Sequence, residues 1–216
     1  MKRLRILFLL CISYTNLLAQ HIQEGSVEFK ITYPGLKGQA KEDLELLPQS
    51  MVIYFKPGKF RLELHTIAGT TVLLTHVLKQ ESYMLMEMMG KKIAMLSTTE
   101  ENRKLEEENK LKYPSEISLG NTTKKIAGYP CREFRVKAQH DSGTHQFIGY
   151  YTDELPDFAS TISSTLYKDI KGFMLEYETM TNGLIMHFTA VKITPKSIDD
   201  VWFEVPPDYQ ITKQSN

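Results

Sequence analysis

Apolar and polar side chains alternate along most of this chain, which is the pattern of β-strands with one buried and one solvated face. In the first such stretch Val27, Phe29 and Ile31 stand at every second position, and Phe60 and Leu62 begin another. Short turns rich in Gly and Pro separate the stretches, so we expect antiparallel neighbours in a meander. The strands predicted in this way cover residues 25–33, 51–55, 60–65, 70–78, 82–89, 92–96, 122–126, 131–136, 147–152, 173–179, 184–193 and 202–205.

Two stretches have helical features instead. Residues 98–110 begin with capping residues and acidic side chains, but their apolar stripe is narrow, which predicts a solvated helix. In 156–171 the apolar residues Phe158, Ile162, Leu166 and Ile170 recur at every fourth position, which predicts a helix that buries this stripe against the sheet. The chain is therefore expected to be mainly β, with two covering helices in one domain over residues 20–216.

A methionine-rich hairpin at residues 83–96 is the most distinctive local feature. It holds five of the ten methionines, and Met84, Met86 and Met88 fall at period 2, so their side chains share one face of a strand, with Met95 on the partner strand. Two interpretations remain open. Thioether ligands suit Cu(I), with His76 as a further ligand; alternatively, unbranched Met side chains form a deformable wall around an apolar ligand.

The N-terminal residues place the chain in the secretory pathway. Basic Lys2, Arg3 and Arg5 precede an apolar run that ends near Ala19, which is the pattern of a signal peptide over residues 1–19. No later stretch is apolar for long enough to predict a transmembrane segment in the mature chain.

Removing the signal peptide leaves 23 basic and 26 acidic residues, and this slightly acidic balance disfavours nucleic acid as a partner. The mature chain then holds a single cysteine, Cys131, so it has no intramolecular disulfide, and we expect this thiol to be buried.

Motifs of enzymes and of cofactor binding are missing from the sequence. It contains no Gly-x-Ser-x-Gly, no His-Glu-x-x-His, no phosphate-binding glycine loop and no paired-cysteine metal spacing. His140, Asp141 and His145 lie together in one predicted hairpin tip, where Asp-Ser-Gly is also ordinary turn chemistry. We therefore expect a protein that is not an enzyme and that carries no cofactor or metal.

Three segments resemble the LolA-like superfamily of periplasmic lipoprotein carriers, and especially its uncharacterised secreted branch. Residues 56–62, Lys-Pro-Gly-Lys-Phe-Arg-Leu, resemble the Arg-Pro-x-x-Phe turn of the carriers. Residues 125–131, Lys-Ile-Ala-Gly-Tyr-Pro-Cys, resemble the Ile-x-Gly-Tyr-x-Cys turn of that branch, and residues 151–155 resemble its entry into the second helix. The resemblance spans most of residues 25–209.

This resemblance implies a strongly curved antiparallel sheet, a half-barrel, whose concave apolar face is covered by two helices and binds acyl chains. It implies a periplasmic or outer-membrane-associated protein, and it makes Lys56 a candidate lid latch in place of the arginine of the carriers. Our leading hypothesis is a non-enzymatic protein that binds a lipid, an acyl chain or another hydrophobic ligand. The alternatives are a ligand-free structural or interaction module that contacts another envelope protein, and Cu(I) binding by the methionines. The candidate wall residues are Phe29, Ile31, Phe60, Leu62, Met84, Met86, Met88, Met95, Phe158, Ile162 and Leu166.

Overall fold

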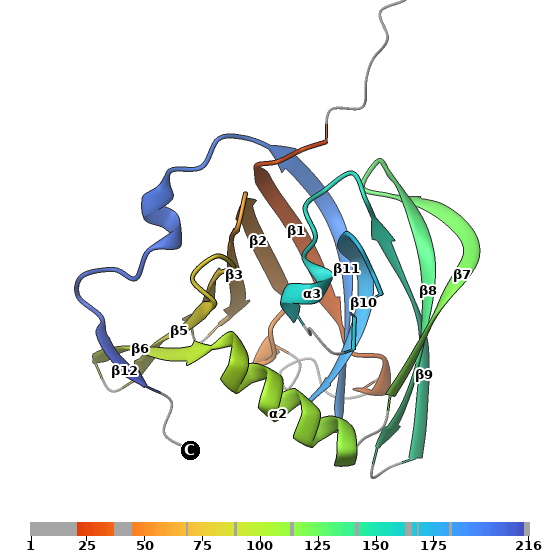
Figure 1. The fold of residues 1–216 in the computed structure, drawn as a ribbon, viewed down its shortest axis with the longest axis horizontal. Coiled ribbons are helices and arrows are strands. Elements are labelled where there is room, and N and C mark those ends of the chain that lie inside the picture. Colours follow the sequence, from red (N-terminus) through yellow and green to blue (C-terminus); the bar gives the residue numbers. More distant parts are fainter. Residues whose placement is uncertain are drawn as a thin grey trace, which may run out of the picture.

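The computed structural model describes residues 21–36, 45–67, 69–88, 90–112, 115–140, 143–162, 166–167, 169–181 and 183–213, so the predicted signal peptide lies outside the described residues. Figure 1 shows a mainly β chain with α-helices beside one large sheet. The strands are β1 (Gly25–Thr32), β2 (Ser50–Lys56), β3 (Lys59–Thr66), β4 (Gly69–His76), β5 (Glu81–Met88), β6 (Lys91–Thr98), β7 (Ser115–Ile126), β8 (Tyr129–His140), β9 (Gly143–Thr152), β10 (Phe173–Thr181), β11 (Leu184–Pro195) and β12 (Gln210–Lys213). The helices are α2 (Thr99–Lys112) and α3 (Ala159–Ile162), with short 3-10 turns η1 (Pro34–Leu36) and η2 (Asp200–Phe203).

All twelve strands form a single open sheet in the order β12-β6-β5-β4-β3-β2-β1-β11-β10-β9-β8-β7. Strands β1 to β6 pair with their sequence neighbours as an antiparallel meander, as the short turns predicted, and β7 to β11 form a second one. Pairing between β1 and β11 joins the two meanders. The two meanders therefore form one continuous sheet, whose edges are β12 and β7.

The prediction of a purely antiparallel sheet was wrong at the C-terminus. Residues 202–205 do not form a strand: Trp202 and Phe203 belong to η2, and Glu204 and Val205 follow it. Strand β12 then pairs with β6 in parallel. Pro206 and Pro207 lack the N–H donors that a ladder needs, which disfavours a strand that continues through them. The chain runs on along the sheet and adds β12 at the edge beyond β6, which makes the sheet mixed.

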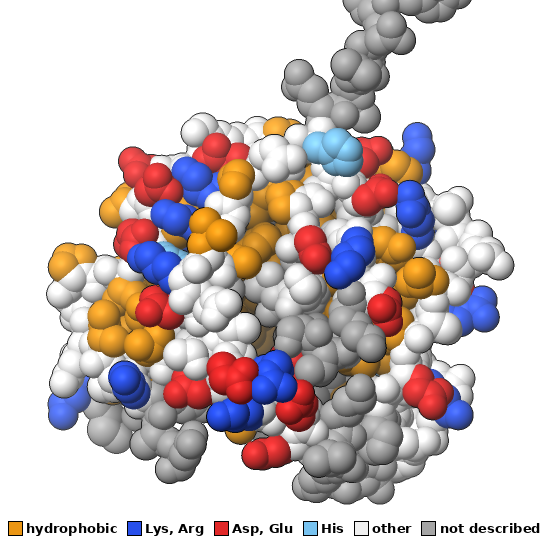
Figure 2. Space-filling model, in the orientation of Figure 1, with side chains coloured by type: hydrophobic (Ala, Val, Ile, Leu, Met, Phe, Trp, Pro, Cys, Tyr) orange, Lys and Arg blue, Asp and Glu red, His pale blue; other side chains and the backbone are white. Residues whose placement is uncertain are grey.

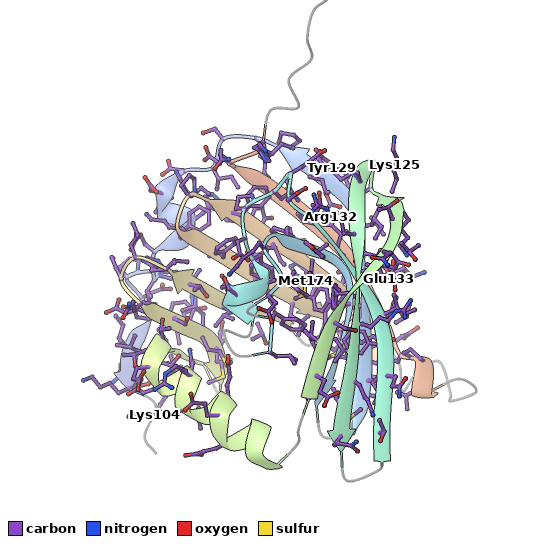
Figure 3. The ribbon with its side chains drawn as sticks, turned by 45° about the vertical axis from the view of Figure 1, so that its right-hand side comes forward. Lys104, Lys125, Tyr129, Arg132, Glu133 and Met174 are labelled. Carbon is purple, nitrogen blue, oxygen red and sulfur yellow. The ribbon has the colours of Figure 1, made fainter. Side chains whose placement is uncertain are left out.

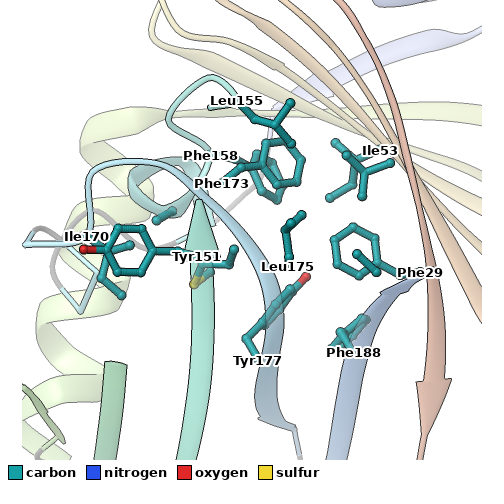
Figure 4. Close-up of a cluster of buried hydrophobic side chains, with 14 of the residues drawn as sticks. Phe29, Ile53, Tyr151, Leu155, Phe158, Ile170, Phe173, Leu175, Tyr177 and Phe188 are labelled. Carbon is teal, nitrogen blue, oxygen red and sulfur yellow. The ribbon is translucent and has the colours of Figure 1, made fainter. Parts of the chain in front are cut away.

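The main core lies between the sheet and the segment that contains α3. Figure 4 shows its aromatic and aliphatic side chains in close contact. Phe158, just before α3, lies 5.1 Å from the ring of Phe60 on β3 and stacks on Phe173 of β10 at 4.9 Å. We call the sheet face that carries Phe60 the inner face and the opposite one the outer face.

The second predicted helix is much shorter than expected. The pattern predicted helix over 156–171, whereas the described helix is α3, Ala159–Ile162. Beyond it Tyr167 and Ile170 are both buried in a turn in which the Ile170 N–H donates to the Tyr167 carbonyl at 2.9 Å. Of the four-residue repeat, Phe158 and Ile170 are buried and Leu166 is half-buried, while the side chain of Ile162 lies outside the described residues.

Helix α2 is solvated, as its narrow stripe predicted. Thr98 and Glu101 cap its start by hydrogen-bonding each other, with the Thr98 N–H donating to Glu101 at 2.7 Å. Leu105 is half exposed, and Lys104 extends away from the sheet (Figure 3). No helix of the described chain is long and apolar enough to cross a membrane.

A second, smaller core forms on the outer face of β4 to β6. Leu74, Leu85 and Ala94 are fully buried there, and Val205 and Tyr209 pack against this cluster. These last two belong to what we call the C-terminal segment, residues 198–213. It covers the outer face of the same strands whose other side carries the methionines.

Candidate functional site

One row of apolar side chains crosses the inner face from the middle of the sheet toward its β12 edge. Residues directly opposite each other in neighbouring strands have their side chains on the same face, so the register defines the row. From β2 to β6 the row consists of Ile53, Leu62, Leu73, Met84 and Met95. We call these five residues the inner row.

The inner row begins in the closed core at Ile53 and is most exposed at Met84. Ile53 is completely buried, Leu62, Leu73 and Met95 are half-buried, and Met84 is 41% exposed. Met86 and Ile93, which face each other on the same side of β5 and β6, are also half-buried. The α3 segment therefore covers the inner face beneath β1 to β3 but leaves apolar surface accessible on β4 to β6.

The two faces of β4 to β6 differ in how completely their apolar side chains are buried. Met84 and Leu85 are neighbours in the chain and point to opposite faces, yet Leu85 is 2% exposed and lies under the C-terminal segment. Strands that carry apolar side chains on both faces are expected to be covered on both. Here the described residues bury the outer face more completely than the inner one. Figure 2 shows a cluster of hydrophobic side chains at this end of the molecule, where β5, β6, β12 and the C-terminal segment lie.

The wall residues predicted from the sequence fall into two environments. Phe29, Ile31, Phe60 and Phe158 belong to the closed core, with at most 3% of each exposed. Leu62 and Leu166 are half-buried beside this core. Met84, Met86 and Met95 line the accessible part of the inner face, and the side chains of Met88 and Ile162 lie outside the described residues.

Sequence reasoning missed Leu73 and Ile93, which are part of the accessible inner surface. Leu73 stands between Val72 and Leu74, so β4 shows no clean alternation, and its burial pattern cannot be assigned from hydrophobicity alone. The signal that finds it is register: the pairing of Leu73 with Met84 places both side chains on one face.

His76 does not share a face with the methionines. It pairs with Glu81 on the outer side of the sheet, is 3% exposed, and its Nε2 donates to the Phe203 carbonyl at 2.5 Å. This side chain therefore contributes to holding the C-terminal segment. Among the residues that the structure describes, no group of three or more His, Cys, Asp and Glu is arranged to hold a metal ion.

Lys56 also contacts the C-terminal segment. Its Nζ donates to the Ile198 carbonyl at 3.1 Å and lies 3.3 Å from Asp200 and 3.6 Å from Glu24. Lys59 adds a bond of 2.9 Å to Asp200, and these two lysines hold the pKa of that carboxyl below its ordinary value. The role of Lys56 as a latch for a helical lid stays a prediction, since these contacts fasten a different segment.

The thiol of Cys131 has the properties of a structural residue. It is 1% exposed, and burial raises its pKa to about 11. The thiolate, which is the reactive form, is therefore scarce at neutral pH. This agrees with the prediction of a buried side chain.

A separate groove of about 590 Å³ lies on β7 to β9, away from the inner row. Its lining is mixed and includes the charged Glu116, Arg135 and Lys137 beside the half-exposed Ile148. None of the predicted wall residues lines it. We therefore assign the candidate site to the accessible inner face of β4 to β6.

A match to a known family covers most of the chain. The model of a family described as a domain of unknown function (DUF4412) matches residues 24–209. No curated protein matches the sequence. The inner row and the C-terminal segment up to Tyr209 both lie within the matched range.

Proposed function

The chain belongs to this DUF4412 family, and we propose that it is a non-enzymatic protein that binds a lipid, an acyl chain or another hydrophobic ligand on the inner face of its sheet. The observation that carries the proposal is the one-sided covering of β4 to β6. Apolar residues occupy both faces of these strands; the outer ones are buried beneath the C-terminal segment, whereas the inner ones are only half-buried and Met84 is 41% exposed. A ligand on the inner face would complete the burial.

The inner row supplies the contacts that such a ligand needs. Its members pass from the closed core at Ile53 to the accessible Met84, so a bound chain would continue an existing apolar surface. Covering apolar area contributes about 25 cal/mol per Å², so a long acyl chain gains several kcal/mol without a specific hydrogen bond. Met suits this role because its unbranched, polarizable side chain adapts to irregular ligands.

The proposal includes a half-barrel shape and a location in the cell envelope. In Figure 1 the segment with α3 lies in front of β10 and β11, with β2 and β3 on one side and β7 to β9 on the other. This arrangement supports a sheet that curves around its ligand side. The predicted signal peptide supports a periplasmic or outer-membrane-associated protein.

Native mass spectrometry of the full chain after gentle purification tests the binding proposal. The expected spectrum contains a species heavier than the chain by the mass of a lipid, which is lost after extraction with organic solvent. Delipidated protein should then bind diphenylhexatriene, a fluorescent hydrocarbon. A single ligand-free mass together with no binding of the hydrocarbon would overturn the proposal.

A ligand-free interaction module of the envelope is the second candidate. The observation in its favour is the filled core under α3, where Phe29, Ile31, Phe60 and Phe158 leave little exposed surface. Such a module would use the outer groove on β7 to β9 in contacts with another protein. It predicts that the purified protein carries no lipid and that the substitution Ile148→Glu in that groove abolishes partner binding.

A further inference from the structure

Charge is distributed unequally between the two faces of β3 to β6. Twelve consecutive inner-facing positions of these strands are uncharged: Phe60, Leu62, Leu64, Thr71, Leu73, Thr75, Ser82, Met84, Met86, Ile93, Met95 and Ser97. The charged residues of the same stretches alternate onto the outer face: Lys59, Arg61, Glu63, Glu81, Glu87 and Lys92. Within the described residues of these four strands, the accessible inner surface therefore offers no counter-charge to a bound ion.

The nearest inner-facing charge in these strands is at their far end. Lys91 pairs with Met88 beside the β5–β6 turn, and it is exposed. Ser97 lies six residues farther along β6, about 20 Å away at the usual rise of a strand. A ligand group near Ser97 is therefore remote from this cation.

A row of hydroxyl groups runs beside the inner row. Register places Thr75, Ser82 and Ser97 next to one another on β4, β5 and β6, two residues from Leu73, Met84 and Met95 along each strand. The three hydroxyl residues are half-buried, and the Ser82 hydroxyl donates to that of Thr75 at 3.4 Å. Each hydroxyl has one donor and two acceptor sites, so the pair can also bond a further polar group.

We infer that the ligand is an uncharged amphiphile, whose alkyl chain lies on the inner row and whose ester, amide or hydroxyl group bonds the hydroxyl row of Thr75, Ser82 and Ser97. This inference rests on the proposed function and specifies its ligand class. A neutral polar group keeps its hydrogen bonds when it moves from water to these hydroxyls. An ionised headgroup in the same place would lose its hydration without gaining an opposite charge, which is far more costly.

Two lipids of equal chain length test the inference in the full chain. Displacement of diphenylhexatriene is measured at pH 8 with monolauroylglycerol, which is neutral, and with laurate, which is ionised. We expect monolauroylglycerol to bind at least tenfold more tightly than laurate. Equal affinities, or tighter binding of laurate, would overturn the inference.

Substitutions of the serines test whether the polar group of the ligand binds at the hydroxyl row. Ser82→Ala and Ser97→Ala should each lower the affinity for monolauroylglycerol roughly two- to tenfold, which is the range for one neutral hydrogen bond. Both should leave diphenylhexatriene binding unchanged. The matched control is Ser118→Ala, which removes an exposed hydroxyl from β7. If neither substitution weakens the neutral lipid, the hydroxyl row is not its site and the inference fails.

The hydrocarbon probe separates this failure from failure of the proposed function. Diphenylhexatriene forms no hydrogen bonds, so its binding reports the apolar surface alone. If neither it nor the two lipids bind, the proposed function fails. If it binds and both lipids displace it equally, the proposed function stands and only the neutral-ligand inference is overturned.

Discussion

Met84 and Leu85 are neighbours in β5 but lie in different environments, one on the proposed ligand-binding face and the other in a packed core. Met84 is 41% exposed on the inner face, whereas Leu85 is 2% exposed on the outer face under the C-terminal segment. We predict that Met84→Ala mainly weakens ligand binding and that Leu85→Ala mainly destabilises the fold. The substitutions are adjacent in the chain, so local strand propensity changes to a similar extent in both.

The expected losses of affinity and of stability follow from the exposed fractions of the two side chains. Met84→Ala removes three heavy atoms, which at about 0.8 kcal/mol for each methylene-sized group amounts to about 2.4 kcal/mol when they are completely buried. The 41% that is still exposed is what a ligand can cover, which gives about 1 kcal/mol or a roughly fivefold loss of affinity. The remainder, about 1.4 kcal/mol, is the expected loss of unfolding free energy. Leu85→Ala should cost about 2–5 kcal/mol, as for other buried leucines.

Urea unfolding gives the free energy of each variant, and titration with diphenylhexatriene gives its affinity for an apolar ligand. Ile148→Ala is the matched control, because Ile148 is 47% exposed on β9, outside the inner row. It should leave the affinity unchanged. The reasoning is refuted if Met84→Ala binds as the wild type does, or if Leu85→Ala is no less stable than Met84→Ala.

Three further predictions concern the scaffold. Gly149→Ala should destabilise the chain by about 1–3 kcal/mol in urea unfolding, since an added Cβ would lie 2.1 Å from the ring of the fully buried Phe134; unchanged stability would contradict this packing. Acid should release the C-terminal segment below about pH 4, because the lowered pKa of Asp200 contributes stability that is present at neutral pH and lost as the pH falls through that pKa. Amide exchange at residues 200–213 should therefore rise in acid, and in Asp200→Asn it should already be high at pH 7. Cys131 should resist iodoacetamide at pH 8 until urea unfolds the chain, and peptide mass mapping would reveal any labelling of the native thiol.

Local patterns in the sequence were sufficient for the elements whose neighbours in space are also neighbours in the chain. Alternation and short turns predicted the meander of β1 to β6, and the narrow apolar stripe of α2 predicted its exposure. They failed for the second helix and for residues 202–205. In both places the structure depends on contacts with distant strands, such as those of Phe158 with Phe60 and of His76 with Phe203.

The sequence by itself determined that Met84 and Met86 share one face of a strand, because side chains alternate with period 2 along any strand. Only the tertiary structure decided what that face contacts. Strand register extends it into the inner row, and the C-terminal segment takes the opposite face, where Leu85 is buried. Covering one face and leaving the other accessible is the result of pairing and packing between residues far apart in the chain, which no local pattern encodes.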